Sequence, residues 1–183
     1  MDDERLMAKK FLDYKDIKSF TRGANYRVDI PLDYIVESLN RYKKDYNLDM
    51  DPDFQRAHVW NEEKQIRFIE FILRSGQSSR EIYFNCPNWM GLRNVGPMVL
   101  VDGKQRLEAI RRFMADEIEI FGGYKMSETD RRCWRVSQTL KFNINNLDTR
   151  AEVLQWYLDI NDGGVIHTSK EIQKVRDLLA AEK

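Results

Sequence analysis

The residues of this chain best suited to bind an anion lie in one short run, DGKQR, from Asp102 to Arg106. The apolar residues 98–101 precede it, and apolar residues at helical spacing follow it from Leu107 onward. A strand, a glycine turn and a helix N-terminus leave backbone N–H groups unpaired, and Lys104 and Arg106 would add positive charge beside them. The run therefore predicts a phosphate site.

The same run also fits an ordinary helix start. Asp102 could serve as the N-cap, and Gln105 three positions later would complete a capping box. From these five residues alone, helix capping and anion binding both stay open.

A second stretch with suitable side chains, DFQRAHVW, runs from Asp53 to Trp60. In an extended conformation, alternation would place Arg56, His58 and Trp60 on one face, where the arginine and the histidine could bind an anion. A surface arginine beside a core-edge histidine and a packed tryptophan also fits this pattern.

The elements that would position these residues form a mixed α and β pattern without an internal repeat. Helices are expected to begin near Pro31, Asn61, Thr149 and Thr168. Strands are expected over 82–86, 98–101, 117–120 and 140–145, where apolar residues alternate with polar ones or run together. Gly163 and Gly164 are expected to end the helix before them.

The length and the charge balance of the chain bound its organisation. Its 183 residues are enough for one well-buried domain, which we expect over 25–183 after an arm or helix over 1–24. Thirty basic and thirty acidic side chains cancel, so any binding of a polyanion must be local. No membrane-length apolar segment or signal-peptide pattern occurs, which favours a cytoplasmic protein without a membrane partner.

Metal and nucleic-acid sites have weaker support in the sequence. The chain has two cysteines and two histidines, too few for a structural metal site, and Cys86 fits a buried apolar position. Trp134 among three arginines could form a basic patch that stacks on nucleic acid, although a solvated strand face also explains it. Asn161 and its neighbours offer too few oxygen ligands for a calcium loop.

Several of these motifs, taken in order, resemble a known family. FQR-x-x-VW, the helix IRFIEFILRSG, a strand, VDGKQRLEAIRRF and a late YLDINDGGV together resemble the N-terminal domain of GmrSD-type modification-dependent restriction proteins, over roughly residues 28–178. That family carries a DGQQR motif and belongs with the ParB and sulfiredoxin-like fold. The resemblance implies an α+β domain in which a small mixed sheet is surrounded by helices.

The resemblance also implies nucleotide binding and, in the restriction members, NTP hydrolysis that controls DNA cleavage. In the wider superfamily, the element that matches Gly103, Arg106 and Ala109 begins a helix that receives nucleotide phosphates. Gln105 and Asp102 would be catalytic by positioning water. The residues assigned to nucleotide binding are Gln55, Arg56, His58, Gly103, Lys104, Arg106 and Asn161.

Two departures from the family pattern limit the expected chemistry. Lys104 stands where the restriction family usually has glutamine, which leaves NTP hydrolysis open. Gln105 occupies the position of the sulfiredoxin catalytic cysteine, which excludes that repair chemistry. With two histidines in the chain and no HNH-like cluster, nuclease activity is not expected from this chain alone.

We therefore expect a nucleotide-binding domain that takes a nucleoside triphosphate and Mg²⁺, with hydrolysis as an open extension. DNA, a separate nuclease or another defence protein would be its partner. The alternative is a non-catalytic DNA-binding or protein-interaction module, such as a phage or mobile-element regulator or a counter-defence factor. Nucleotide-independent DNA binding with a steep salt dependence would distinguish this alternative.

Overall fold

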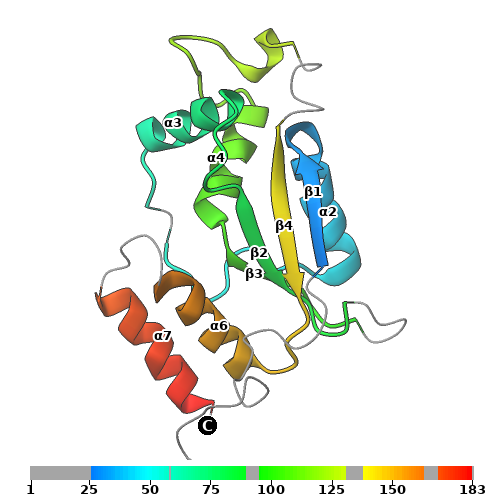
Figure 1. Ribbon diagram of the computed structural model, residues 1–183, viewed down its shortest axis with the longest axis vertical. Helices are drawn as coiled ribbons and strands as arrows, with labels where there is room; N and C mark the ends of the chain where they lie inside the picture. Colours follow the sequence, from blue (N-terminus) through cyan, green and yellow to red (C-terminus); the bar gives the residue numbers. More distant parts are fainter. Residues whose placement is uncertain (1–25, 58, 90–94, 131–137, 163–168, 183) are drawn as a thin grey trace, which may run out of the picture.

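An open four-stranded mixed sheet forms the centre of the protein in the computed structural model (Figure 1). The structure describes residues 26–57, 59–89, 95–130, 138–162 and 169–182. In spatial order the strands are β1 (Tyr26–Pro31), β4 (Thr139–Asn145), β2 (Glu81–Asn85) and β3 (Val99–Asp102). The central pair β4 and β2 is parallel, and each edge strand pairs antiparallel with its neighbour.

Five α-helices surround this sheet in the described part of the chain. They are α2 (Ile35–Tyr46), α3 (Glu62–Leu73), α4 (Lys104–Met114), α6 (Arg150–Asp162) and α7 (Ser169–Ala181). Figure 1 shows α3 beside α4 at one end of the molecule and α6 beside α7 at the other. The two helices of each pair are in contact with each other. Two short 3-10 segments, Leu32–Tyr34 and Met126–Glu128, complete the described helical structure.

The two faces of the sheet contribute to two separate hydrophobic clusters. Strand side chains alternate, so Phe84 and Leu100 enter a main core with residues of α2, α3 and α4. Val101 and the partly buried Tyr83 belong instead to a second cluster with residues of α6 and α7, which we call the α6–α7 cluster. The ring of Tyr83 meets Trp156 of α6 at 5.9 Å. Each helix group is therefore held by its own face of the sheet.

Most of the predicted helix starts are confirmed where the structure describes them. A 3-10 turn and then α2 follow Pro31, and the Asn61 side chain caps α3 by accepting from Lys64 N at 3.0 Å. Before α6, Thr149 N donates to the Glu152 carboxylate at 3.2 Å and Glu152 N donates to Thr149 Oγ1 at 3.3 Å. This is the expected capping box.

Two expectations about strands need correction. Residues 117–120 form no strand, although Ile118 and Ile120 are both buried. The alternation there reflects only that one side of the segment is buried. Gly122 and Gly123, both at positive φ, turn the chain back, so a single bridge between Ile120 and Tyr124 forms in place of a strand. Strand β1 was not expected, although the alternation of residues 26–30 would have indicated it.

The α+β class with a small mixed sheet is confirmed. The predicted N-terminal arm over 1–24, the patch around Trp134, the helix stop at Gly163 and Gly164 and the cap at Thr168 lie outside the described residues. In the described part of the chain, no helix is long and apolar enough to span a membrane.

Candidate functional site

The turn between β3 and α4 leaves the start of a helix without a side-chain cap. Gly103 is the N-cap of α4 and has φ 112°, in the left-handed region that favours glycine. No side chain among the described residues caps this helix, so the alternative capping box of Asp102 and Gln105 is wrong. The left-handed turn puts the cap at Gly103, and both side chains bond elsewhere. The first-turn N–H groups therefore remain suited to an anion.

Packing adds a second reason for glycine at position 103. A Cβ built on Gly103 would lie 2.5 Å from Cδ1 of Ile82 on β2. The start of α4 therefore lies directly on the sheet, and this contact fixes where its N–H groups point.

A cavity of about 580 Å³ opens beside this turn. It is lined by the β3–α4 turn, the segment that leads into α3, α3 itself, the residues just before β2 and the end of α6. Its charged lining residues are Arg56, Lys64, Arg67, Arg106 and Asp102. Four cations thus face one carboxylate, which favours an anionic ligand of more than one charge.

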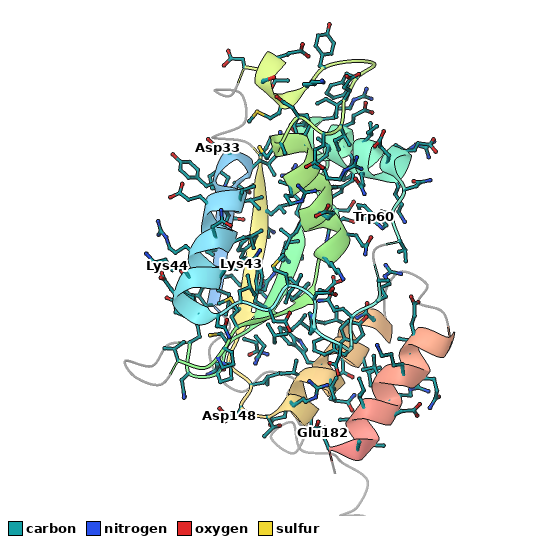
Figure 2. The ribbon with its side chains drawn as sticks, turned by 180° about the vertical axis from the view of Figure 1, so that it is seen from behind. Asp33, Lys43, Lys44, Trp60, Asp148 and Glu182 are labelled. Carbon is teal, nitrogen blue, oxygen red and sulfur yellow. The ribbon has the colours of Figure 1, made fainter. Side chains whose placement is uncertain are left out.

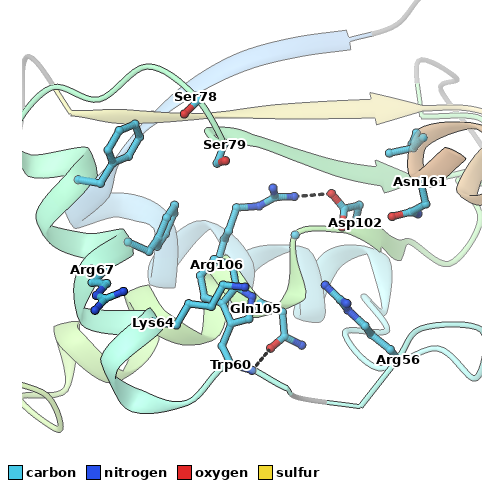
Figure 3. A pocket seen from close by; sticks show the side chains of 14 residues that line it. Arg56, Trp60, Lys64, Arg67, Ser78, Ser79, Asp102, Gln105, Arg106 and Asn161 are labelled. Atoms are coloured by element: carbon cyan, nitrogen blue, oxygen red, sulfur yellow. Dashed lines mark hydrogen bonds and ion pairs between the residues drawn. The ribbon is translucent and has the colours of Figure 1, made fainter. Parts of the chain in front are cut away.

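Different elements supply the side chains at the two ends of the cavity. Figure 3 shows Lys64 and Arg67 of α3 at one end, Arg56 and Asn161 at the other, and the Arg106–Asp102 pair between them. Trp60 lies where the chain enters α3, on the side of the molecule opposite α2 (Figure 2).

Arg106 is held in place but keeps donors available. One of its terminal nitrogens bonds to the Asp102 carboxylate one helical turn away, and both side chains are largely buried. The Nε of Arg106 is buried and has no hydrogen-bond partner among the described residues. A buried donor of this kind is costly unless a ligand or water satisfies it.

Gln105, which the sequence predicts to position water, makes three hydrogen bonds to the segment that leads into α3. Its amide oxygen accepts from Val59 N and Trp60 N, both at 3.0 Å, and its amide nitrogen donates to Ala57 O at 3.3 Å. The side chain is only 6% exposed. Its hydrogen bonds therefore hold Ala57, Val59 and Trp60 against α4.

Gln55 also holds this segment, because its amide nitrogen donates to Leu100 O on β3. The two glutamines fix the chain on both sides of Arg56. Arg56 and Trp60 consequently reach the cavity, although none of the described residues among 53–60 lies in a strand.

The structure brings together six of the nine predicted site residues. The cavity is lined by Arg56, Asp102, Gly103, Gln105, Arg106 and Asn161. Gln55 lies behind it, and Lys104 bonds to Asp51 and lines a separate cavity of about 470 Å³ between α2 and α4. His58 lies outside the described residues.

Sequence reasoning missed the contribution of α3. Lys64, Arg67, Phe68 and Phe71 all line the cavity, and their spacing of three, four and seven residues is that of one helix face. That mixed basic and aromatic stripe is visible in the sequence once the apolar stripe of Ile69 and Ile72 is assigned to the core. Ser78 and Ser79, which also line the cavity, carry no comparable signal.

The end of α6 closes the cavity on the side of Arg56. Asn161 Nδ2 donates to Tyr157 O at 2.7 Å, and Asn161 is one of the lining residues. Burial, together with the charge of Asp102 and against the opposing charge of Arg56, raises the pKa of Tyr157 to about 12. The phenol therefore stays protonated near neutral pH.

The described residues contain no group of three or more His, Cys, Asp or Glu side chains that could hold a metal ion. Among the described residues that line the cavity, Asp102 is the only carboxylate. A metal at this site would therefore depend on a ligand for most of its coordination.

Cys86 is buried as expected, and burial raises the pKa of its thiol to about 11.

These features define an α+β domain with a cationic cavity at a strand, glycine turn and helix. The family model described as GmrSD restriction endonuclease, N-terminal domain, matches residues 35–176. Because this match covers more than half of the chain, the protein belongs to that family, and membership implies a role linked to modification-dependent restriction systems. No curated protein and no solved structure gave a match to the chain.

Proposed function

We propose that this domain binds a nucleoside triphosphate in the cavity, with its phosphates at the Gly103 turn. The observation that carries the proposal is that the uncapped N-terminus of α4 and the side chain of Arg106 line one cationic cavity. Backbone N–H groups and a guanidinium are the donors that bind phosphate oxygens most strongly in proteins. Arg56 would contact the phosphates from the opposite wall.

We also propose that the fold is of the ParB and sulfiredoxin-like type. In that superfamily the counterpart of Gly103 and Arg106 begins a phosphate-receiving helix, which agrees with the arrangement of the uncapped turn. The small mixed sheet with helices on both faces supports this assignment.

Magnesium fits the site as a companion of the nucleotide. Mg²⁺ is commonly held by one or two carboxylates together with substrate phosphates and water. Asp102 would supply the carboxylate, and the remaining ligands would come with the nucleotide. Incoming phosphates would compete with Asp102 for Arg106, which would release the carboxylate for the metal.

Hydrolysis is the second part of the proposal. Gln105 is assigned to holding residues 57–60, since its three hydrogen bonds already engage its amide. Asp102 is then the cavity residue best placed to position water, and Arg56 with Arg106 would stabilise the developing charge. We further propose that the nucleotide state is read in the cytoplasm by DNA or by a separate nuclease or defence protein.

Titration calorimetry of the full chain with nucleoside triphosphates and Mg²⁺ tests the proposal. We expect binding by the native protein and at least a tenfold loss of affinity in Arg106→Ala, because a charge-assisted fork to phosphate is lost. Arg41→Ala is the matched control, since Arg41 lies exposed on α2 and forms an ion pair only with Glu37 among the described residues. Unchanged affinity in a folded Arg106→Ala protein would contradict the proposal.

The alternative function uses the same cations differently. Four basic side chains along one cavity would also suit the phosphates of a nucleic-acid backbone. Binding of DNA that weakens steeply with salt, without any response to nucleotide, would favour a non-catalytic DNA-binding module.

A further inference from the structure

The α3 end of the cavity is aromatic, whereas the Gly103 end is polar. Trp60, Phe68 and Phe71 line it together with Lys64 and Arg67. Phosphates need none of these rings, so this end of the cavity requires a separate explanation. A ligand that fills both ends has an anionic part and a flat apolar part.

The three rings differ in what already covers them. Lys64 Nζ lies 5.0 Å from the centre of the Trp60 ring, and Phe68 meets that ring at 5.5 Å. Phe68 itself is only 6% exposed. Phe71 is 41% exposed and has no aromatic or cationic partner among the described residues. Phe71 is therefore the ring available to a ligand.

The exposed ring of Phe71 is also held in position. A Cβ built on Gly76 would lie 2.4 Å from two carbons of that ring, so the ring occupies space that any other residue at position 76 would fill. Gly76 N donates to Phe71 O at 2.9 Å, which fixes the two residues to each other. An exposed aromatic ring that is held in one position is typical of a stacking surface.

Two hydroxyl groups line the cavity across from the helix that carries Phe71. Ser78 and Ser79 are both exposed lining residues, and Figure 3 shows them on the β2 side of the cavity. A serine hydroxyl rotates and can either donate or accept a hydrogen bond. These hydroxyl groups can hydrogen-bond to the edge of any base, so they favour no particular base strongly.

We infer that the α3 end of the cavity is a nucleobase subsite in which Phe71 stacks on the base and Ser78 and Ser79 contact its edge. The inference rests on the proposed phosphate site at Gly103. Stacking on an aromatic ring is available to every base, so the site accepts purine and pyrimidine nucleotides with affinities within about tenfold of each other. The ligand class is therefore a nucleoside triphosphate of any base, in preference to an inorganic polyphosphate.

Titration calorimetry of the full chain with ATP, UTP and inorganic tripolyphosphate, each with Mg²⁺, tests this subsite. We expect Phe71→Ala to weaken both nucleotides roughly tenfold and to leave tripolyphosphate unchanged, because only the nucleotides carry a base. Phe121→Ala is the matched control, since Phe121 is also 41% exposed and does not line the cavity. Phe71→Tyr keeps the ring and should restore nucleotide affinity.

Gly76→Ala provides a second variant that leaves Phe71 itself intact. The added methyl group would displace the ring, so the same selective loss of nucleotide affinity is expected. Equal loss for tripolyphosphate and nucleotides, or no loss in a folded Phe71→Ala protein, would overturn the subsite and leave the phosphate site standing. Absence of binding of all three ligands to the native protein would overturn both. A preference of more than about tenfold between ATP and UTP would overturn the assignment of the serines.

Discussion

Replacement of Gln105 by leucine tests whether its amide holds the segment that leads into α3. The change keeps the side-chain volume but removes two hydrogen bonds of 3.0 Å from Val59 N and Trp60 N and one of 3.3 Å to Ala57 O. Each of the two shorter bonds contributes about 1 kcal/mol, and the unpaired N–H groups add a further cost. Val59 is exposed, so water can partly replace its bond. We expect the free energy of unfolding to fall by about 2 kcal/mol.

Urea unfolding followed by circular dichroism measures this change directly, and the melting temperature should fall by about 4–8 °C. Gln155→Leu on α6 is the control. Gln155 is exposed, and within the described part of the chain its side chain bonds only to Asp159 one turn away, so its loss should cost less than about 0.5 kcal/mol. If Gln105→Leu is as stable as this control, the amide does not hold the segment and the reasoning fails.

Three further predictions concern stability and reactivity. Gly103→Ala should lower the free energy of unfolding by about 2 kcal/mol or more in urea, because it combines a strained positive φ with a contact of 2.5 Å to Ile82; unchanged stability would contradict this. Arg80→Met should cost about 3 kcal/mol in the same assay, because the buried guanidinium donates to three backbone carbonyls and one amide oxygen that would lose their partner. In a Cys133→Ser background, Cys86 should react with a thiol reagent at pH 8 only after denaturation, since burial raises its pKa to about 11. The contribution of this buried thiol to the free energy of unfolding is constant below pH 9.0 and declines as the pH rises toward 11.

The elements that sequence patterns predict well are those whose cause is local. Asn61 caps α3 and Thr149 begins a capping box because both signals act within four residues. Alternation over 82–86 and 140–145 indicates strands correctly because the apolar residues of each share one face, which packs into the main core. The same pattern at 117–120 misleads, since burial of alternate residues does not require a paired strand.

The candidate site was predictable in its centre and not at its edges. Gly103 and Arg106 follow from the local strand, turn and helix pattern. Lys104 is adjacent in sequence but points to another cavity, where it meets Asp51, a partner distant along the chain. The hydrogen bonds of Gln105 to residues 57–60 depend equally on tertiary packing. No local pattern contains that information.

The separation of the hydrophobic residues into a main core and an α6–α7 cluster has a consequence for signalling. Arg106 and Lys64 belong to helices anchored in the main core, whereas Asn161 extends from a helix anchored in the α6–α7 cluster. A ligand that contacts both walls adds its binding free energy to the contact between these two groups of helices. Occupancy would then be thermodynamically linked to how firmly the α6–α7 pair is docked on the sheet, so a partner that binds this pair could sense the ligand without touching it.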